Sequence, residues 1–111
     1  MNYQQKIDLQ KKIISDLAHS TNNFAVNCHN SFEHESAKLK EFMRLKQLGH
    51  KVLTEAKFKN GSGITDIIDL TTGIITEILW TETLEEAKKK VEKYPDYFED
   101  IRFLKIRITR I

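Results

Sequence analysis

The segment Gly49–Glu82, GHKVLTEAKFKNGSGITDIIDLTTGIITEILWTE, decides the fold of this 111-residue chain. It contains three short runs rich in apolar and β-branched residues, KVLTEAKF, ITDIIDL and IITEILW, and such runs predict β-strands. The turn-forming sequences KNGSG and TTG separate the runs. Its acids include Asp66 on the second predicted strand and Glu77 on the third. We therefore expect three consecutive strands, with Asp66 on the second and Glu77 on the third.

The register between the second and third strands decides whether these two acids can act together. Side chains alternate between the two faces of a sheet, so a slip of one residue would send the acids to opposite faces. We expect Asp66 and Glu77 to share a face only if the hairpin pairs Ile68 near Glu77 rather than near Thr76. The register is thus a geometric test of any joint function.

Ahead of this segment, the sequence has helical spacing in two places. Residues 3–19 carry a narrow apolar stripe, which predicts a peripheral helix that packs on the core or on a partner subunit. Residues 20–30 are rich in Asn, Ser and Thr and predict a connector. A second helix is expected to begin at Ser31, as its N-cap, and to stop at Gly49. The apolar positions of the first stripe are Ile7, Ile13, Ile14 and Leu17.

Glu35 lies on the predicted apolar face of the second helix. It follows Phe32 by three residues and precedes Leu39 by four, and residues at these spacings share one side of a helix. A buried acid is unfavourable unless it is paired or lies near a metal ion. The alternative is that Glu35 lies at the rim of this face, near the helix N-terminus, where the dipole favours an acid. The predicted face comprises Phe32, Leu39, Phe42, Met43 and Leu48.

After the three strands, the sequence predicts one more helix and one more strand. The helix is expected to begin at Thr81 or Thr83 and to end at Pro95. Residues 100–111, DIRFLKIRITRI, alternate and predict a strand with interleaved basic residues. These basic residues suit either an edge of the sheet protected from aggregation or a contact with phosphate. The predicted inner face of the helix is Leu84, Ala87, Val91 and Tyr94.

The composition is that of an ordinary globular domain. Charged residues make up 31% of the chain and apolar residues 40%, and its length suits one domain. The net charge of +2 is too small to indicate nucleic-acid binding by itself. Cys28 is the only cysteine, which excludes an intrachain disulfide and a zinc site built from cysteines. No apolar run approaches the ~20 residues of a membrane span, and no signal-peptide core is present, so we expect a cytoplasmic protein.

Several short motifs follow one another in residues 31–111. Glu35 stands on the helix, GHKV leads into the first strand, Ser-Gly precedes the second strand, DII contains Asp66, and a glycine precedes Glu77 by four residues. Together with the order helix, three strands, helix, strand, these motifs resemble the PD-(D/E)xK (restriction-endonuclease-like) nuclease superfamily, and most closely the archaeal Holliday-junction resolvases. The resemblance covers the predicted core and leaves residues 1–30 as an additional helix and connector of one single domain.

The resemblance implies a three-layer α/β fold around a mixed sheet and the activity of a metal-dependent DNA endonuclease of resolvase type. It also implies that Asp66, Glu77 and Glu35 are the metal ligands and catalytic acids, with Mg²⁺ or Mn²⁺ as the cofactor. The cation in such an enzyme polarises the phosphate and lowers the pKa of the attacking water. The resemblance further implies DNA as the substrate, with branched DNA as one candidate form, and a homodimer as the assembly.

The sequence departs from the family pattern at Leu79, where the catalytic lysine is expected. Two hypotheses follow. A lysine reaches the site from elsewhere, and Lys57 is the first candidate because alternation places it on the same face of the first strand as Glu55 and Leu53. Alternatively, the fold is catalytically silent and serves as a nucleic-acid-binding or protein-interaction module. Glu82, just after the third strand, adds an acid that is either an outer ligand or a helix-start charge.

Overall fold

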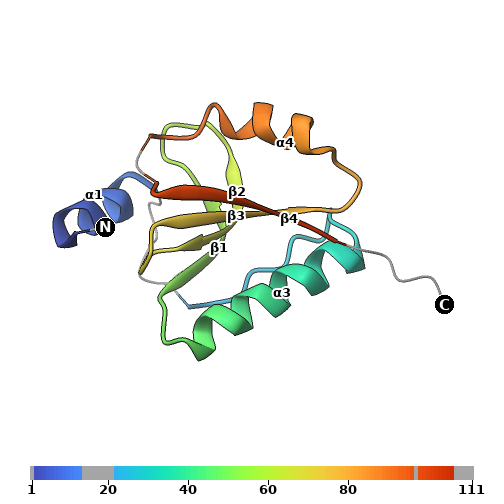
Figure 1. The fold of residues 1–111 in the computed structure, drawn as a ribbon, viewed down its shortest axis with the longest axis horizontal. Coiled ribbons are helices and arrows are strands. Elements are labelled where there is room, and N and C mark those ends of the chain that lie inside the picture. The colour runs from blue at the N-terminus through green and yellow to red at the C-terminus, as the bar shows by residue number, and fades with distance from the viewer. Residues whose placement is uncertain (1, 14–21, 97, 107–111) are drawn as a thin grey trace.

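The structure, a computed structural model, describes residues 2–13, 22–96 and 98–106 of the chain. Its elements follow the order expected from the sequence: an N-terminal helix, then a helix, three strands, a helix and a strand (Figure 1). They are α1 (Tyr3–Ile13), α3 (Phe32–Gln47), β1 (Val52–Lys57), β2 (Ile64–Asp69), β3 (Ile74–Leu79), α4 (Leu84–Val91) and β4 (Asp100–Lys105).

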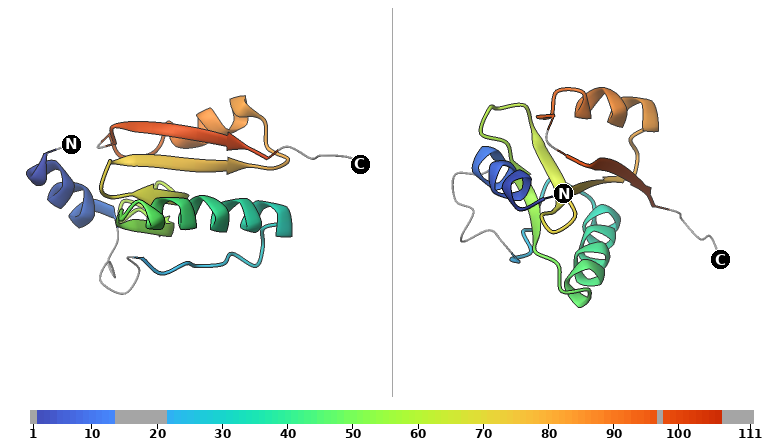
Figure 2. Two further views of the ribbon diagram at one scale, coloured as in Figure 1. Left: turned by 60° about the horizontal axis from the view of Figure 1, so that its bottom comes forward. Right: turned by 60° about the vertical axis from the view of Figure 1, so that its left-hand side comes forward.

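The four strands form one mixed sheet in the order β1-β2-β3-β4. β1, β2 and β3 are antiparallel neighbours, whereas β4 follows α4 and pairs parallel with β3. Helix α3 covers one face of the sheet and α4 covers the other (Figure 1 and Figure 2). One core cluster joins Phe42 and Leu45 of α3 to Ile67 of β2, and a second joins Ile68 of β2 to Tyr94, just beyond α4. The chain is therefore an α/β domain with a mixed sheet, as predicted.

The hairpin of β2 and β3 pairs Ile68 with Ile75, two residues away from the expected pairing with Glu77. A shift of two residues preserves the alternation of side chains between faces, whereas a shift of one would reverse it. Continuing this register one pair beyond Ile67–Thr76 places Asp66 opposite Glu77. The two acids therefore share a face of the sheet, and the geometric condition for joint action is met.

β1 is interrupted at Glu55, whose φ of 51° lies in the left-handed region that non-glycine residues rarely adopt. Leu53 and Ala56 consequently belong to the same core cluster, although they are three residues apart, and Phe58 joins them. Lys57 lies between two members of this cluster, so it points to the other face, and its side chain is exposed. The prediction that Leu53, Glu55 and Lys57 share a face is therefore wrong, because the left-handed residue reverses the alternation.

Helix α3 has Ser31 as its N-cap, as predicted, but it buries a different face. Of the predicted apolar face only Phe42 is buried, and Phe32 is 82% exposed. The helix is rotated so that Lys38 points inward, where two carboxylates neutralise its charge. Glu35 also points inward, with a side chain that is 12% exposed. The buried residues of α3 are Lys38, Glu41, Phe42 and Leu45, whereas Phe32, Leu39, Met43 and Leu48 are exposed.

Helix α4 is short, and its first turn depends on the N-cap Thr83. Oγ1 of Thr83 accepts a hydrogen bond from the backbone N–H of Glu86 at 3.1 Å. Replacing Thr83 with alanine leaves this N–H without its partner, and we expect the free energy of unfolding to fall by about 1 kcal/mol in urea titrations. Thr81→Ala, which is exposed and lies outside the cap, should change it by less than about 0.5 kcal/mol. Equal losses in the two variants would contradict the capping role.

Helix α1 packs on the core through Leu9, which is fully buried in the same cluster as Leu53. Leu9 is not part of the apolar stripe predicted for residues 3–19. Residues 14–19 of that predicted helix and residues 107–111 of the predicted last strand lie outside the described residues. In the part of the chain that the structure describes, no helix has both the length and the apolar character to span a membrane.

Candidate active site

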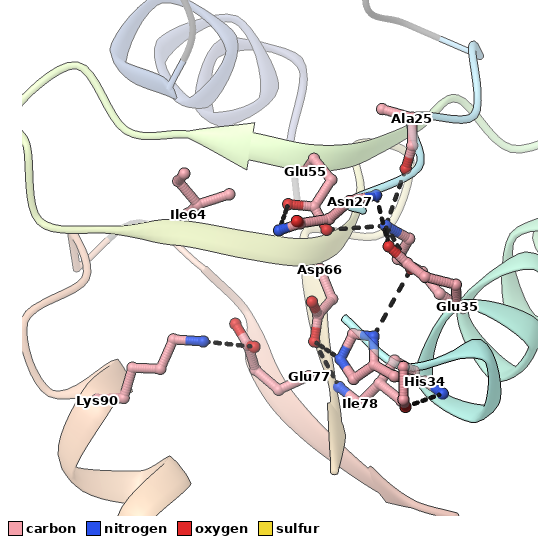
Figure 3. A network of polar contacts seen from close by, with 12 residues as sticks. Ala25, Asn27, His34, Glu35, Glu55, Ile64, Asp66, Glu77, Ile78 and Lys90 are labelled. Carbon is pink, nitrogen blue, oxygen red and sulfur yellow. Dashed lines mark hydrogen bonds and ion pairs between the residues drawn. The ribbon is translucent and has the colours of Figure 1, made fainter. Parts of the chain in front are cut away.

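An open cavity of about 810 Å³ lies where the first turn of α3, the strands β2 and β3, and α4 meet. Asp66 reaches its wall from β2, and Lys90 reaches it from α4 (Figure 3). The left-handed Glu55 contributes from β1. The cavity is therefore built from segments that are far apart in the sequence. Its titratable and amide side chains are Asn27, His29, Asn30, His34, Glu55, Asp66, Glu82 and Lys90.

Asp66 is a buried, ionised carboxylate. Its Oδ2 accepts a hydrogen bond from the backbone N–H of Ile78 at 2.8 Å and lies 3.4 Å from Nε2 of His34 (Figure 3). Burial by itself would raise the pKa of Asp66, but His34, the Ile78 amide and the charge of Lys90 outweigh this effect and hold the pKa below its ordinary value. Asp66 is thus negatively charged at neutral pH.

Glu77 lies beside Asp66 on the neighbouring strand and is almost completely buried. The hydroxyl of Tyr94 donates a hydrogen bond to its Oε1 at 2.8 Å, and Nζ of Lys90 lies 3.6 Å from its Oε2. Burial, followed by the negative charge of Asp66, raises the pKa of Glu77 to about 7, and Lys90 only partly opposes them. Burial and the charge of Glu77 raise the pKa of Tyr94, so its hydroxyl keeps the proton. Glu77 is thus poised to exchange a proton near neutral pH.

His34 lies between two acids in the first turn of α3. Its Nε2 faces Asp66, and its Nδ1 lies 3.6 Å from Oε2 of Glu35. Burial would lower the pKa of the imidazole, but Asp66 and Glu35 outweigh this and raise the pKa above its ordinary value. The sequence-based prediction did not include His34 in the site. The signal present in the sequence is its position directly before Glu35 and three residues after the N-cap Ser31.

A second buried cluster, centred on Lys38 of α3, adjoins the cavity. Nζ of Lys38 is buried and lies 2.8 Å from Oε2 of Glu35 and 2.8 Å from Oε1 of Glu55. It also donates a hydrogen bond to the carbonyl of Ala25 at 2.8 Å, and the backbone N–H of Asn27 donates to Glu35 at 2.6 Å. One ammonium group therefore ties together α3, β1 and the segment that precedes α3.

The structure brings Asp66 and Glu77 together but not the third predicted ligand. Glu35 is paired with Lys38, and His34 lies between Glu35 and Asp66 (Figure 3). Among residues 2–13, 22–96 and 98–106, no three His, Cys, Asp or Glu side chains are placed to hold one metal ion. The predicted three-carboxylate site is not formed within these residues, because the buried Lys38 takes up the charge of Glu35.

The lysine beside the two acids is Lys90 of α4 rather than the predicted Lys57. Lys57 is exposed at the end of β1 and does not belong to the cavity wall. Leu79, where the sequence resemblance predicted a lysine, is buried. Glu82, for which the sequence left open an outer ligand or a helix-start charge, lines the cavity. In the sequence, Lys90 is only the last of three consecutive lysines. The packing of α4 on the sheet places it beside Glu77.

The fold and the site define an α/β domain in which Asp66 lines an open, polar cavity and the buried Glu77 interacts with it from the adjacent strand. No protein-family model, curated protein or solved structure matches the chain. The function is therefore inferred from the geometry and electrostatics of this site.

Proposed function

We propose that the chain is a divalent-cation-dependent phosphodiesterase that cleaves DNA, with the three-layer core of PD-(D/E)xK nucleases. One observation carries this proposal: Asp66 and Glu77 are buried carboxylates on adjacent strands, and the charge of Asp66 helps to raise the pKa of Glu77 to about 7. Two such groups are unfavourable as neighbours unless a cation or a proton lies with them. The order of the elements and the parallel pairing of β4 with β3 support the same class of protein.

The donor set suits Mg²⁺ or Mn²⁺ held by two protein carboxylates. Mg²⁺ prefers oxygen ligands, keeps several waters and is commonly bound through one or two carboxylates together with substrate phosphates. Asp66 and Glu77 would hold the ion, and the cavity in front of Asp66 has room for a phosphate and water. The bound ion would polarise the phosphate and lower the pKa of a water molecule. Glu35 is not required as a ligand in this arrangement.

The surrounding side chains have separate roles in this proposal. Lys90 lines the cavity and offers a positive charge to a phosphate oxygen, the role expected of a lysine at position 79. His34 keeps Asp66 ionised, and Tyr94 orients Glu77 through its hydrogen bond. In the metal-free protein the pKa of Glu77 is about 7, and a bound cation would take the place of the proton that this carboxyl then holds.

Cleavage of linear, single-stranded and branched DNA in Mg²⁺, Mn²⁺ or EDTA tests the proposal. We expect the wild-type protein to cleave with either ion and not in EDTA. Asp66→Asn and Glu77→Gln preserve shape but remove a charge, and each should lower the cleavage rate at least ~100-fold. Lys90→Ala should lower it ~10-fold or more, whereas the exposed neighbour Lys89→Ala and the variant Lys57→Ala should change it less than ~3-fold.

Cleavage that persists in both acid variants would show that the site is assigned wrongly. The second candidate function is a catalytically silent module that binds nucleic acid or a protein. It is favoured by Leu79 at the position of the motif lysine and by the pairing of Glu35 with Lys38. Binding of DNA without cleavage under every ion condition would support this second function and contradict the first.

A further inference from the structure

Trp80 lines the cavity whose wall also contains Asp66. It is the only tryptophan of the chain, and its side chain is partly buried. Within residues 2–13, 22–96 and 98–106, no other aromatic ring and no cation stacks on its indole, and the indole N–H has no hydrogen-bond partner. A large aromatic ring that lines a polar cavity without such contacts offers its face to a ligand.

The end of β3 fixes the position of Trp80 relative to the two acids. The backbone N–H of Ile106, just after β4, donates a hydrogen bond to the carbonyl of Leu79 at 2.9 Å, so the strand is held directly before the tryptophan. Trp80 follows Glu77 by three residues, and their Cα atoms are therefore at most about 10 Å apart. A planar ligand on the indole would lie close to the proposed metal site.

The charges of the cavity suit a nucleobase better than a second phosphate. Three carboxylates line it, those of Glu55, Asp66 and Glu82, and Lys90 is the only lysine or arginine in the wall formed by the described residues. The proposed cation and Lys90 can neutralise one phosphate, but a further phosphate in the cavity would be repelled. A base is uncharged, and its amino group can donate a hydrogen bond to a carboxylate.

A base can stack on this indole only when it is unpaired. In a duplex, each base is covered by its neighbours, and moving it out costs unstacking and unpairing energy. Enzymes that bind an extruded base commonly hold it between aromatic and apolar side chains. The cavity supplies Trp80 together with Ile64, an apolar side chain that is 45% exposed. Its volume of about 810 Å³ suits a ligand of the size of a nucleotide.

We propose that an unpaired nucleobase stacks on Trp80 in this cavity, so that the substrate is single-stranded DNA or a duplex with an unpaired base beside the cleavage site. The inference rests on the proposed function, because that function supplies DNA as the ligand, and it adds the form of the DNA. Fully paired DNA, linear or branched, should bind at least ~10-fold more weakly, which is the effect of losing one base–aromatic stack.

The fluorescence of Trp80 reports this contact directly, because the chain has no other tryptophan. The full chain is titrated in Ca²⁺, a cation that binds oxygen ligands, with three probes. The probes are a single strand of about 10 nucleotides, its blunt duplex and an abasic strand of the same length. The single strand should quench the fluorescence and bind at least ~10-fold more tightly than the other two. Equal binding of the single and abasic strands would overturn the proposal. Denaturing gels verify that the strands stay intact.

Substitutions of Trp80 separate stacking from packing. Anisotropy of a fluorescein-labelled single strand should show binding weakened at least ~10-fold in Trp80→Leu, which retains apolar volume without an aromatic face. Trp80→Phe retains such a face and should weaken binding less than ~3-fold. Tyr3→Ala is the control, because Tyr3 is 79% exposed on α1 and does not line the cavity. It should also change binding less than ~3-fold. Circular dichroism verifies that each variant is folded.

The results distinguish a failure of this inference from a failure of the proposed function. Quenching that requires bases, without cleavage in Mg²⁺ or Mn²⁺, would support the stacking site and contradict the nuclease. Equal cleavage of single strands and blunt duplexes, with Trp80→Leu as active as the wild type, would support the nuclease and contradict the stacking site. A single strand that does not bind at about 100 μM, or that binds Trp80→Leu as tightly as the wild type, would also overturn the inference.

Discussion

Replacing Lys38 with methionine should lower the free energy of unfolding by roughly 3–5 kcal/mol, the usual cost of removing one partner from a buried ion pair. Methionine fills most of the volume of lysine, so the cavity contribution is small. The loss arises because Glu35 and Glu55, whose side chains are only 12% and 16% exposed, would both lose the ammonium group that they share. The carbonyl of Ala25 would lose a hydrogen bond as well. Urea unfolding at pH 7 measures the change.

Neutralising the two acids distinguishes an unpaired charge from lost packing as the cause of this destabilisation. In the triple variant Lys38→Met, Glu35→Gln and Glu55→Gln, most of the stability should return, because a fully neutral cluster has no unpaired charge to bury. Lys57→Met, on the exposed end of β1, is the control and should change the free energy of unfolding by less than about 0.5 kcal/mol. A single variant that loses less than about 1 kcal/mol would mean that the charge of Lys38 is not essential for stability.

Replacing Glu77 with glutamine should stabilise the metal-free protein above pH 7 by about 3 kcal/mol, although it should lower the rate of the proposed cleavage at least ~100-fold. The pKa of Glu77 in the folded chain is about 7, above the ordinary 4.5, so its ionisation is less favourable in the folded than in the unfolded chain. The wild-type protein therefore loses stability as the pH rises from about 4.5 to about 7, and the loss is constant at higher pH. Glutamine cannot ionise and avoids this loss, and its side-chain oxygen can still accept from Tyr94.

Thermal unfolding in EDTA at pH 4.5 and pH 8 measures this effect. The two proteins should have similar stability at pH 4.5 and should differ at pH 8, and Glu92→Gln, at the exposed C-cap of α4, is the control substitution. Addition of Mg²⁺ at pH 8 should raise the melting temperature of the wild-type protein, because an ion bound between Asp66 and Glu77 favours the folded state. The same addition should have little effect on Glu77→Gln. Equal stability of both proteins at pH 8 in EDTA would contradict the raised pKa.

The order of the elements was predictable because the interactions that establish it are local. Ser31 and Thr83 cap their helices through contacts three residues along the chain. The strands followed from apolar runs and from the turns between them. The short TTG turn keeps β2 and β3 close, and the pattern of apolar residues favours a register in which Asp66 and Glu77 share a face.

The buried face of α3 was not predictable from helical spacing. Phe32, Leu39 and Met43 form one apolar row and Phe42 and Leu45 form another, and the helical period fits both equally well. Burial of the second row also buries a lysine, which any prediction from hydrophobicity disfavours. Burial of Lys38 is tolerated because the lysine pairs with Glu35 of its own helix and with Glu55 of β1. Glu55 adopts the left-handed backbone conformation.

The sequence alone determined the succession of helices and strands and placed Asp66 and Glu77 on neighbouring strands, because both depend on residues close together in the chain. Only the tertiary structure decided that Glu35 pairs with Lys38 instead of joining these acids. It also decided that His34 of α3 lies beside Asp66 and that Lys90 of α4 lies beside Glu77. The physical reason is that tertiary packing determines which helix or strand supplies the partner of each charged group. The residue spacing within one segment therefore does not predict which charged groups will pair in the low-dielectric interior.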